Sequence, residues 1–512
     1  MRPEAIMVAA LLAGAAQAGP LFAPQPAPAH SYDGGWEHFV GGGVAVFDCN
    51  GDRLPELFVA GGSNPAQLLV NRSPVGGALR FDASTPAPLA VTGVTGAYPL
   101  DIDSDGHLDL VILRAGENLV MRGGADCSFR RWNPRGFNGG DRWTTAFSAT
   151  WESGRARPTL AFGNYVNRDD PDGPFGTCDD NQLFRPKAGR YRETPLHPGF
   201  CALSMLFIDW RRSGRADLRI SNDRHYYVRG GEEQLWAMEP NPRLYTAEEG
   251  WRSYALWGMG IASRDLTFDG RPEVFLTSMG DQRLQFFTGD DAPTWEDAPY
   301  ALGTTAHRPY TGGDGRPSTG WHAAFGDVQN DGLDDIFVAK GNVQQMPDAA
   351  MDDPNNLLVQ QPDGRFVEMG DVAGLASLHR ARGAALADLN RDGLLDAVVV
   401  NRRGPLEIFR NVTADAGLWL TVALHQPAPN VNAVGAFIEL DLGDRIVTRE
   451  ITVGGGHAGG TAGPEYFGLG AVDRARLRVI WPDGAVSDWA TVRAGQHLDV
   501  IRTGEALDIR TY

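Results

Sequence analysis

The sequence predicts an all-β protein, a seven-bladed β-propeller followed by a small β-sandwich-like C-terminal domain. Glycine makes up 64 of the 512 residues and proline 33, a composition that favours tight turns and short strands over long helices. An acidic turn motif recurs along the chain, and each copy runs directly into an apolar, strand-like segment. Repeats of about 40 to 60 residues that each hold several short strands are typical of propeller blades.

The repeat is best seen from the first acid of each motif. Neighbouring copies lie 53 to 62 residues apart, except for one step of 108 residues between Asp101 and Asp209. That gap predicts a further copy near residue 152, where WESGRARPTLAFGNY keeps the glycine turn and has lost the acids. Each loop is followed by an apolar pair led by an amide or an acid, from AQLLVN to LEIFRN. We therefore expect seven units between residues 39 and 411; a linear β-solenoid, which would need shorter repeats, is the alternative.

The complete motifs place oxygen atoms at positions one, three, five and nine of a tight turn, and the position-seven carbonyl can also turn inward. Carboxylates about 5 Å apart repel each other by about a kcal/mol in water and by more at lower dielectric. A cation among them would offset this repulsion, and an all-oxygen ligand set with flexible geometry suits Ca²⁺ rather than Mg²⁺ or softer metals. We therefore predict about five calcium ions.

The predicted metal ligands, with position seven contributing only its carbonyl, are Asp48, Asn50, Asp52, Leu54 and Glu56; Asp101, Asp103, Asp105, His107 and Asp109; Asp265, Thr267, Asp269, Arg271 and Glu273; Asp327, Gln329, Asp331, Leu333 and Asp335; and Asp388, Asn390, Asp392, Leu394 and Asp396.

These loops have two other interpretations. An EF-hand needs Glu at position twelve, where this chain has Val59, Ile112, Leu276, Val338 and Val399 inside the expected strands. This excludes an EF-hand. Asp, Asn and Gly also form polar turns without any metal, and that alternative stays open.

Arginines stand near the two degenerate motifs, at positions 155 and 157 and at positions 211, 212 and 215. We hypothesise that a guanidinium replaces the ion there as the partner of Asp209 and Asp217. The alternative is that these arginines are ordinary surface residues.

The first 18 residues read as a signal peptide, with an apolar run that ends at a small-residue cleavage site. Residues 19–38 are then a lead-in to the propeller. No later segment reaches the roughly 20 apolar residues that span a bilayer, so we expect no transmembrane segment in the mature chain. A net charge of −18 argues against nucleic acid as a partner. We expect an exported protein, extracellular or periplasmic.

Four cysteines remain, and an oxidising compartment allows three ways to pair them. Cys178 and Cys201 flank one glycine- and proline-rich loop and are the favoured disulfide. Cys49 and Cys127 pair only by elimination. The spacing of the cysteines argues against a zinc site.

Several stretches carry a resemblance to known families. GGGVAVFDCNGD, GMGIASRDLTFDGRPEVFLTSMG and RGAALADLNRDGLLDAVVVNRRGPLEIFRN resemble FG-GAP/VCBS repeats, as in the propeller of integrin α-subunits. In residues 412–512, NAVGAFIELDL, EYFGLG and VIWPDGAVSDW resemble the ASPIC/UnbV domain. The arrangement, over roughly residues 31–505, is similar to the cartilage acidic protein family, which implies a secreted, acidic, calcium-binding protein.

Two departures from that family pattern stand out. Arg53 occupies position six of the first loop, where glycine is usual. GGGHAGGTAG replaces the aromatic residue and Ser-Gln pair that usually precede the GLG segment. Its GGGHAG matches the dinucleotide fingerprint G-x-G-x-x-G, but no helix can follow, so phosphate binding is not expected, and we interpret His457 as a loop residue.

No catalytic residue is predicted, because the chain shows no nucleophile-elbow, zinc-protease or phosphate-loop motif. We expect a binding or adhesion module for an extracellular or periplasmic protein or glycan. The alternatives are a secreted or periplasmic enzyme acting on polysaccharide, or a lectin. Five tryptophans could either line a sugar-binding rim or pack in the core: Trp36, Trp143, Trp251, Trp257 and Trp321.

Overall fold

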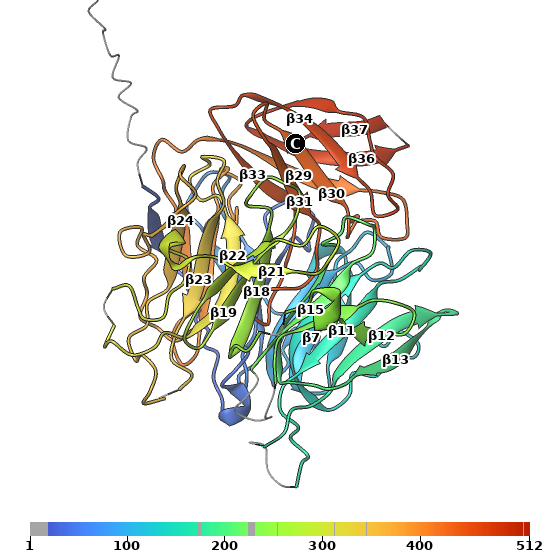
Figure 1. Ribbon diagram of the computed structural model, residues 1–512, viewed down its shortest axis with the longest axis vertical. Helices are drawn as coiled ribbons and strands as arrows, with labels where there is room; N and C mark the ends of the chain where they lie inside the picture. Colours follow the sequence, from blue (N-terminus) through green and yellow to red (C-terminus); the bar gives the residue numbers. More distant parts are fainter. Residues whose placement is uncertain are drawn as a thin grey trace, which may run out of the picture.

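The computed structural model describes residues 19–171, 176–223, 231–252, 254–311, 313–344, 346–504 and 506–512. The expected signal peptide, residues 1–18, lies outside these residues. The described chain is built from β-strands and short 3-10 turns, which confirms the all-β fold (Figure 1). The turns are η1 (Trp36–His38), η2 (Ala87–Leu89), η3 (Ala125–Cys127), η5 (Ala247–Glu249) and η6 (Tyr300–Leu302).

Seven four-stranded antiparallel sheets follow one another in the described residues, and we number them as blades one to seven. A two-residue pairing of β10 with β7 joins blades two and three. The strands are, blade by blade, β2 (Val44–Phe47), β3 (Glu56–Val59), β4 (Gln67–Asn71) and β5 (Phe81–Ala83); β6 (Val94–Leu100), β7 (Asp109–Gly116), β8 (Leu119–Gly124) and β9 (Ser128–Trp132); β10 (Arg142–Thr150), β11 (Thr159–Asn164), β12 (Asn181–Lys187) and β13 (Arg190–Leu196); β14 (Ala202–Ile208), β15 (Asp217–Asn222), β16 (Gln234–Ala237) and β17 (Arg243–Leu244); β18 (Gly258–Arg264), β19 (Glu273–Ser278), β20 (Arg283–Phe287) and β21 (Trp295–Asp297); β22 (Gly320–Gly326), β23 (Asp335–Lys340), β24 (Asn356–Gln360) and β25 (Phe366–Glu368); and β26 (Ala381–Ala387), β27 (Asp396–Asn401), β28 (Glu407–Asn411) and β1 (Phe22–Gln25).

The first strands of the blades contact one another in order, and β26 of blade seven contacts β2 of blade one, so the sheets form a closed ring. The outer strand of blade seven is β1, which pairs antiparallel with β28. Residues 19–38, predicted to be a lead-in, thus include the outer strand of the last blade. Because β1 completes the last blade, Phe22–Gln25 joins the two ends of the ring.

The C-terminal domain is a β-sandwich of two four-stranded sheets. Its buried core includes Leu420, Ile438, Phe467, Leu477 and Trp481. The first sheet contains β33 (Glu465–Gly470), β29 (Leu418–His425), β36 (Gln496–Thr503) and β37 (Ala506–Thr511), and the second contains β31 (Ile446–Glu450), β30 (Phe437–Asp441), β34 (Arg474–Ile480) and β35 (Ala490–Arg493).

The sandwich lies against one end of the ring, where its strands appear in orange to red in Figure 1. That end is the face that carries the acidic loops. Arg449 of the sandwich forms a buried ion pair of 2.7 Å with Asp334 of the sixth-blade loop. Phe268 of the fifth-blade loop packs against the sandwich core. The C-terminal domain therefore covers the loop face of the propeller.

One segment of the sandwich, residues 451–464, runs into the ring. Val453, Gly454, Gly456 and Gly459 each bridge to the first strand of a different blade, and β32 (Thr461–Ala462) pairs parallel with β2. His457, expected to be a loop residue, is fully buried, and its ring centre lies 5.1 Å from that of Trp321. The GGGHAGGTAG segment therefore lies in the axis of the ring as a plug; we call residues 451–464 the plug.

Three of these five tryptophans lie in the core and cannot line a sugar-binding rim. Trp143, Trp251 and Trp321 are buried, and the Trp36 ring packs edge-on against Trp143 at 4.7 Å between ring centres. Large aromatic side chains gain more from burial in the blades than from exposure to water, so packing is their role.

The close approach of the plug can be tested at Gly96 in β6. A methyl group on Gly96 would lie 1.8 Å from the carbonyl oxygen of Ala458. We expect Gly96→Ala to lower the free energy of unfolding by roughly 1–3 kcal/mol, because backbone must move to admit it. Thermal unfolding followed by circular dichroism checks this. Gly463→Ala in the plug is the control, since a methyl group there meets nothing within 4 Å; equal melting temperatures for the two variants would contradict the plug.

Candidate metal centres

The five complete acidic loops connect the first and second strands of blades one, two, five, six and seven, and they share one hydrogen-bond pattern. The backbone N–H of position six donates to the carboxylate of position one at 2.6 to 3.0 Å. The N–H of position seven donates to the carboxylate of position five at 2.7 to 3.1 Å. The turn thus holds the position-one and position-five carboxylates through its own backbone.

The position-nine acid is held in a different way. It begins the second strand, is buried, and accepts the N–H of position two at 2.7 to 3.0 Å in all five loops. In blades two, six and seven it also accepts an N–H from the third strand, at Gly123, Gln360 and Asn411. The position-nine acid therefore ties the loop to its blade.

The loops are compact because two residues in each adopt left-handed backbone angles. Position six is glycine in four loops, with φ between 80° and 87°. In blade one it is Arg53, whose φ of 67° is costly for a residue with a side chain, as its sequence position indicated. The guanidinium of Arg53 ion-pairs with Asp499 of the sandwich at 3.0 Å, which helps to hold this conformation.

In blade two, the structure brings carboxylate oxygens of Asp101, Asp103 and Asp109 within 4.8 Å of one another. Asp103 Oδ1 is buried and accepts no hydrogen bond from the described residues. Arg122 binds the other oxygen of Asp103 and also Asp105, each at 2.8 Å. Three carboxylates with an unused buried oxygen form a donor set that fits a hard cation such as Ca²⁺.

The other predicted ligands make contacts within their loops. Asn50 donates to Glu56 at 3.0 Å, Gln329 donates to Asp331, and Asn390 donates to Asp392 at 2.9 Å. The side-chain carbonyl oxygens of Asn50 and Asn390 accept the backbone N–H of position five, at 2.8 Å from Asp52 and 3.2 Å from Asp392. The side chain of Arg271 turns away and donates to the carbonyl of Trp210 at 3.2 Å, as expected for a residue that would offer only its own carbonyl.

Burial raises the pKa of the loop carboxyl groups, and repulsion from neighbouring carboxylates adds to the shift. The pKa of Asp265 rises to about 6, those of Glu56 and Asp388 to about 7, and those of Asp109 and Glu273 to about 8. The pKa values of Asp327, Asp335 and Asp396 lie well above the usual range for the same reason. A cation that binds these loops must therefore displace protons near neutral pH.

In blade four, Asp217 stands at position nine and is held by neutral donors. Its Oδ2 accepts the indole N–H of Trp210 at 2.9 Å and the hydroxyl of Tyr245 at 2.8 Å. Arg215 lies within ion-pair distance, at 3.9 Å, whereas Arg212 binds Glu439 of the sandwich. A guanidinium is thus only a distant partner of Asp217, and its close partners are the neutral groups of Trp210 and Tyr245.

In blade three, Trp151 stands at position one, where the complete loops have Asp. The neighbouring Glu152 accepts from the hydroxyl of Thr159 at 2.8 Å and pairs with Arg185 at 2.7 Å. The arginines expected to replace the ion contact other groups: Arg155 donates to the Pro186 carbonyl, and Arg157 lies over the Trp132 ring.

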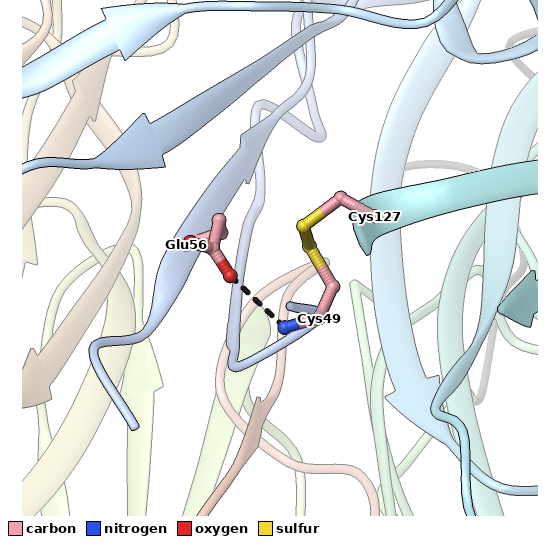
Figure 2. Close-up of side chains that lie close together, drawn as sticks. All are labelled: Cys49, Glu56 and Cys127. Carbon is pink, nitrogen blue, oxygen red and sulfur yellow. Dashed lines mark hydrogen bonds between the residues drawn. A yellow bond between two sulfur atoms is a disulfide. The ribbon is translucent and has the colours of Figure 1, made fainter. Parts of the chain in front are cut away.

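Both disulfides are present, Cys178–Cys201 and Cys49–Cys127. Figure 2 shows the second beside Glu56, with the N–H of Cys49 donating to the Glu56 carboxylate at 2.9 Å. Because the two sulfurs are bonded to each other, this cluster offers no thiolate to a metal.

A cavity of about 670 Å³ lies between the loop face and the sandwich. Its wall includes Asp48, Asp101, Asp265 and Asp388 from four acidic loops and Glu450 from the sandwich, whose pKa burial raises to about 8. This cavity could not be predicted from the sequence, because it lies where the sandwich meets the loops and inner strands of the ring.

Comparison with known families supports this arrangement. The family model described as ASPIC and UnbV matches residues 426–506, within the sandwich, and the model described as FG-GAP-like repeat matches residues 48–112, in blades one and two. The chain is thus an FG-GAP-like propeller with an ASPIC/UnbV domain, the layout of the cartilage acidic protein-like family that its sequence resembles.

The chain is similar to cartilage acidic protein 1 from several vertebrates. Identity is 36% over 101 residues with the Xenopus tropicalis protein and 35% over 101 residues with the Homo sapiens protein, in each case 20% of this chain and 13% of the relative. With the Mus musculus protein it is 28% over 166 residues, 31% of this chain and 23% of the relative. The matches span less than a quarter of these relatives.

Solved structures show only distant likeness. BBS1N in its complex with ARL6DN has a TM-score of 0.46 at 11% identity and covers 78% of this chain and 99% of its own. Trypanosoma rangeli sialidase with sialic acid has a TM-score of 0.37 at 10% identity and covers 94% of this chain and 92% of its own. Neither likeness bears on function. Among the described residues, no helix is both long and apolar enough to cross a bilayer.

The raised pKa values predict how the ion-free protein responds to pH. The folded-state pKa values of about 6 to 8 exceed the value of about 4 in an unfolded chain, so the folded state binds more protons between these limits. We expect the melting temperature in excess chelator to fall as the pH rises from 5 to 8. In excess calcium the fall should be smaller, because the cation favours the ionised carboxylates. A melting temperature that rises with pH in chelator would contradict this.

Proposed function

We propose that this chain is an exported calcium-binding propeller that acts as a binding or adhesion module for a protein or glycan, and that about five calcium ions stabilise its fold. The observation that supports this most strongly is the pattern common to the five complete loops. Each holds acids at positions one, five and nine of a backbone-fixed turn, and most of these carboxyl groups are buried enough to raise their pKa. Turns of solvated polar residues would not need to bury them.

The residues of each loop would share the work of holding an ion. The acids of positions one, five and nine and the residue of position three supply oxygen ligands, and the position-seven carbonyl completes the set. A bound Ca²⁺ supplies the positive charge that lets these carboxylates stay ionised in a buried turn. A site at a calcium concentration a hundredfold above its Kd would add about 2.7 kcal/mol to the stability.

The ions would also stabilise the contact between the two domains. Position four of four loops contacts the sandwich. The Ser104 hydroxyl accepts a hydrogen bond from it, and Phe268 packs against its core. The Asn330 carbonyl accepts a backbone hydrogen bond from it, and Arg391 lies over its Tyr512 ring. An ion that fixes the turn fixes these contacts as well. Calcium would thus favour the closed arrangement of propeller and sandwich.

Binding rather than catalysis is favoured by the filled axis. Residues 453–462 occupy the centre of the ring, and His457 and His322 there are buried and used in hydrogen bonds to the backbone of other segments. A substrate entering along the axis would have to displace the plug. Besides the cavity between the loop face and the sandwich, the outer walls of the blades and the face opposite the sandwich are open to a ligand.

Calcium removal gives the first test of the proposal. We expect the purified mature chain to hold about five calcium ions by elemental analysis, and excess chelator to lower its melting temperature by well over 10 °C, since several sites contribute together. Magnesium at equal concentration serves as the control cation and should restore the melting temperature less than calcium does. A calcium-free chain whose melting does not respond to chelator would exclude the proposed role of the ions.

A single ligand tests whether the loops themselves bind. Asp103→Asn removes a charge from the blade-two loop, whose carboxylates lie within 4.8 Å of one another. We expect this variant to bind one ion fewer per chain by equilibrium dialysis. Asp82→Asn, at an exposed position in β5, is the control and should bind the full number. If both variants bind equally, the loop does not hold an ion.

The ligand class can be tested with a glycan array and a matched protein panel, each with calcium and with chelator. A binding module should show saturable binding that weakens in chelator and leaves the bound glycan intact. Cleavage of a glycan during the assay would favour the polysaccharide-degrading alternative instead.

A further inference from the structure

The Cys49–Cys127 disulfide is placed to support the first acidic loop. Cys49 occupies position two of that loop, and Cys127 lies in η3, between β8 and β9 of blade two. The N–H of Cys127 also donates to the carbonyl of Cys49 at 3.1 Å. Cys49 is thus fixed to the neighbouring blade by one covalent bond and one backbone hydrogen bond.

Position two makes the same contact in all five loops: its N–H donates to the position-nine carboxylate. In blade one this bond runs from Cys49 to Glu56 Oε2 at 2.9 Å, as Figure 2 shows. The other oxygen of Glu56 accepts from Asn50 at 3.0 Å. Movement of Cys49 would therefore release the position-nine acid.

The other loops anchor position two by burying a large apolar side chain. Ile102, Val328 and Leu389 are fully buried, and Leu266 is 6% exposed. Cys49 is smaller and only partly buried, so packing alone holds it less firmly. In blade one, the disulfide takes the place of the buried apolar anchor.

The first loop also needs an external anchor more than the others do. Its position six is Arg53 in a left-handed conformation, at φ 67°, where the other loops have glycine. The second support of this loop is the contact of Arg53 with the sandwich, through Asp499 at 3.0 Å and the Tyr512 ring. Without the disulfide, the contacts of Arg53 with the sandwich and the hydrogen bonds within the turn would have to hold this conformation.

We propose that the Cys49–Cys127 disulfide is a positioning element of the first cation site, so that occupancy of this one site depends on the redox state of the chain. This rests on the proposed function, since it assumes that the loops bind calcium. A dithiol that reduces the bond transfers two electrons and two protons to the sulfurs. The products are thiols at Cys49 and Cys127 and a cyclic disulfide of the reductant.

The direct test compares calcium stoichiometry in the full chain. Cys49→Ser/Cys127→Ser should bind one ion fewer than the unmodified chain at the same free calcium. Cys178→Ser/Cys201→Ser, which removes the other disulfide, is the matched control and should bind the full number. Cys49→Leu/Cys127→Ala should recover the lost ion, because leucine is the anchor that blade seven uses at Leu389. A full number of ions in the serine variant would overturn the proposal.

A second measurement uses the unmodified chain and does not depend on the folding of a variant. Because coupling is reciprocal, calcium at the first site should protect the disulfide from reduction. Dithiothreitol titration with alkylation and mass spectrometry should show that half-reduction of Cys49–Cys127 needs about tenfold more reductant in calcium than in chelator. The Cys178–Cys201 bond should not shift.

The two possible failures are distinguishable. If calcium raises the reductant concentration for half-reduction equally at both disulfides, or at neither, in a chain that binds about five ions, only the role of Cys49–Cys127 is overturned. A chain that binds no calcium in any form would overturn the proposed function itself.

Discussion

The structure depends on one constraint: acidic side chains must be crowded into short turns and partly buried there. Carboxylates in such turns repel one another and lose hydration, which raises their pKa, as Glu56, Asp109 and Glu273 show. The backbone offsets part of this cost by donating N–H groups to positions one, five and nine. The remaining cost is what a bound cation would offset, and blade four shows another solution, since Asp217 there is satisfied by Trp210 and Tyr245.

These turns also determine how the two domains meet. The sandwich lies on the loop face, contacts the loops through position four, and sends the plug down the axis of the ring. The plug must be rich in glycine because it passes between inner strands: a methyl group on Gly459 would lie 2.2 Å from the carbonyl oxygen of Val44. The geometry of the loops, the contact between the domains and the position of the plug are thus coupled, so a change in one should alter the others.

Much of the propeller could be predicted from sequence because each blade carries a short motif of neighbouring residues. The acids from Asp388 to Asp396 recur with the same spacing in five copies, and each is followed by an apolar strand, which is enough to predict the units, the loops and the candidate ligands. The left-handed conformation of Arg53 was also foreseeable, because glycine occupies that position elsewhere.

The parts that could not be predicted depend on contacts between distant segments. Phe22–Gln25 is too short to be recognised as a strand before its partner β28 is known. GGGHAG looks like a flexible loop because glycine carries no side-chain pattern, and only the ring around it makes it a plug. The groups that donate to Asp217 come from two different stretches of the chain, so no local sequence motif predicts them.

The most direct measurement is a crystal structure of the mature chain grown with calcium, with anomalous scattering recorded to locate the ions. The account predicts anomalous peaks about 2.3–2.6 Å from the acidic oxygens in blades one, two, five, six and seven, and none in blades three and four. Ordered loops in those five blades without any such peak would contradict it.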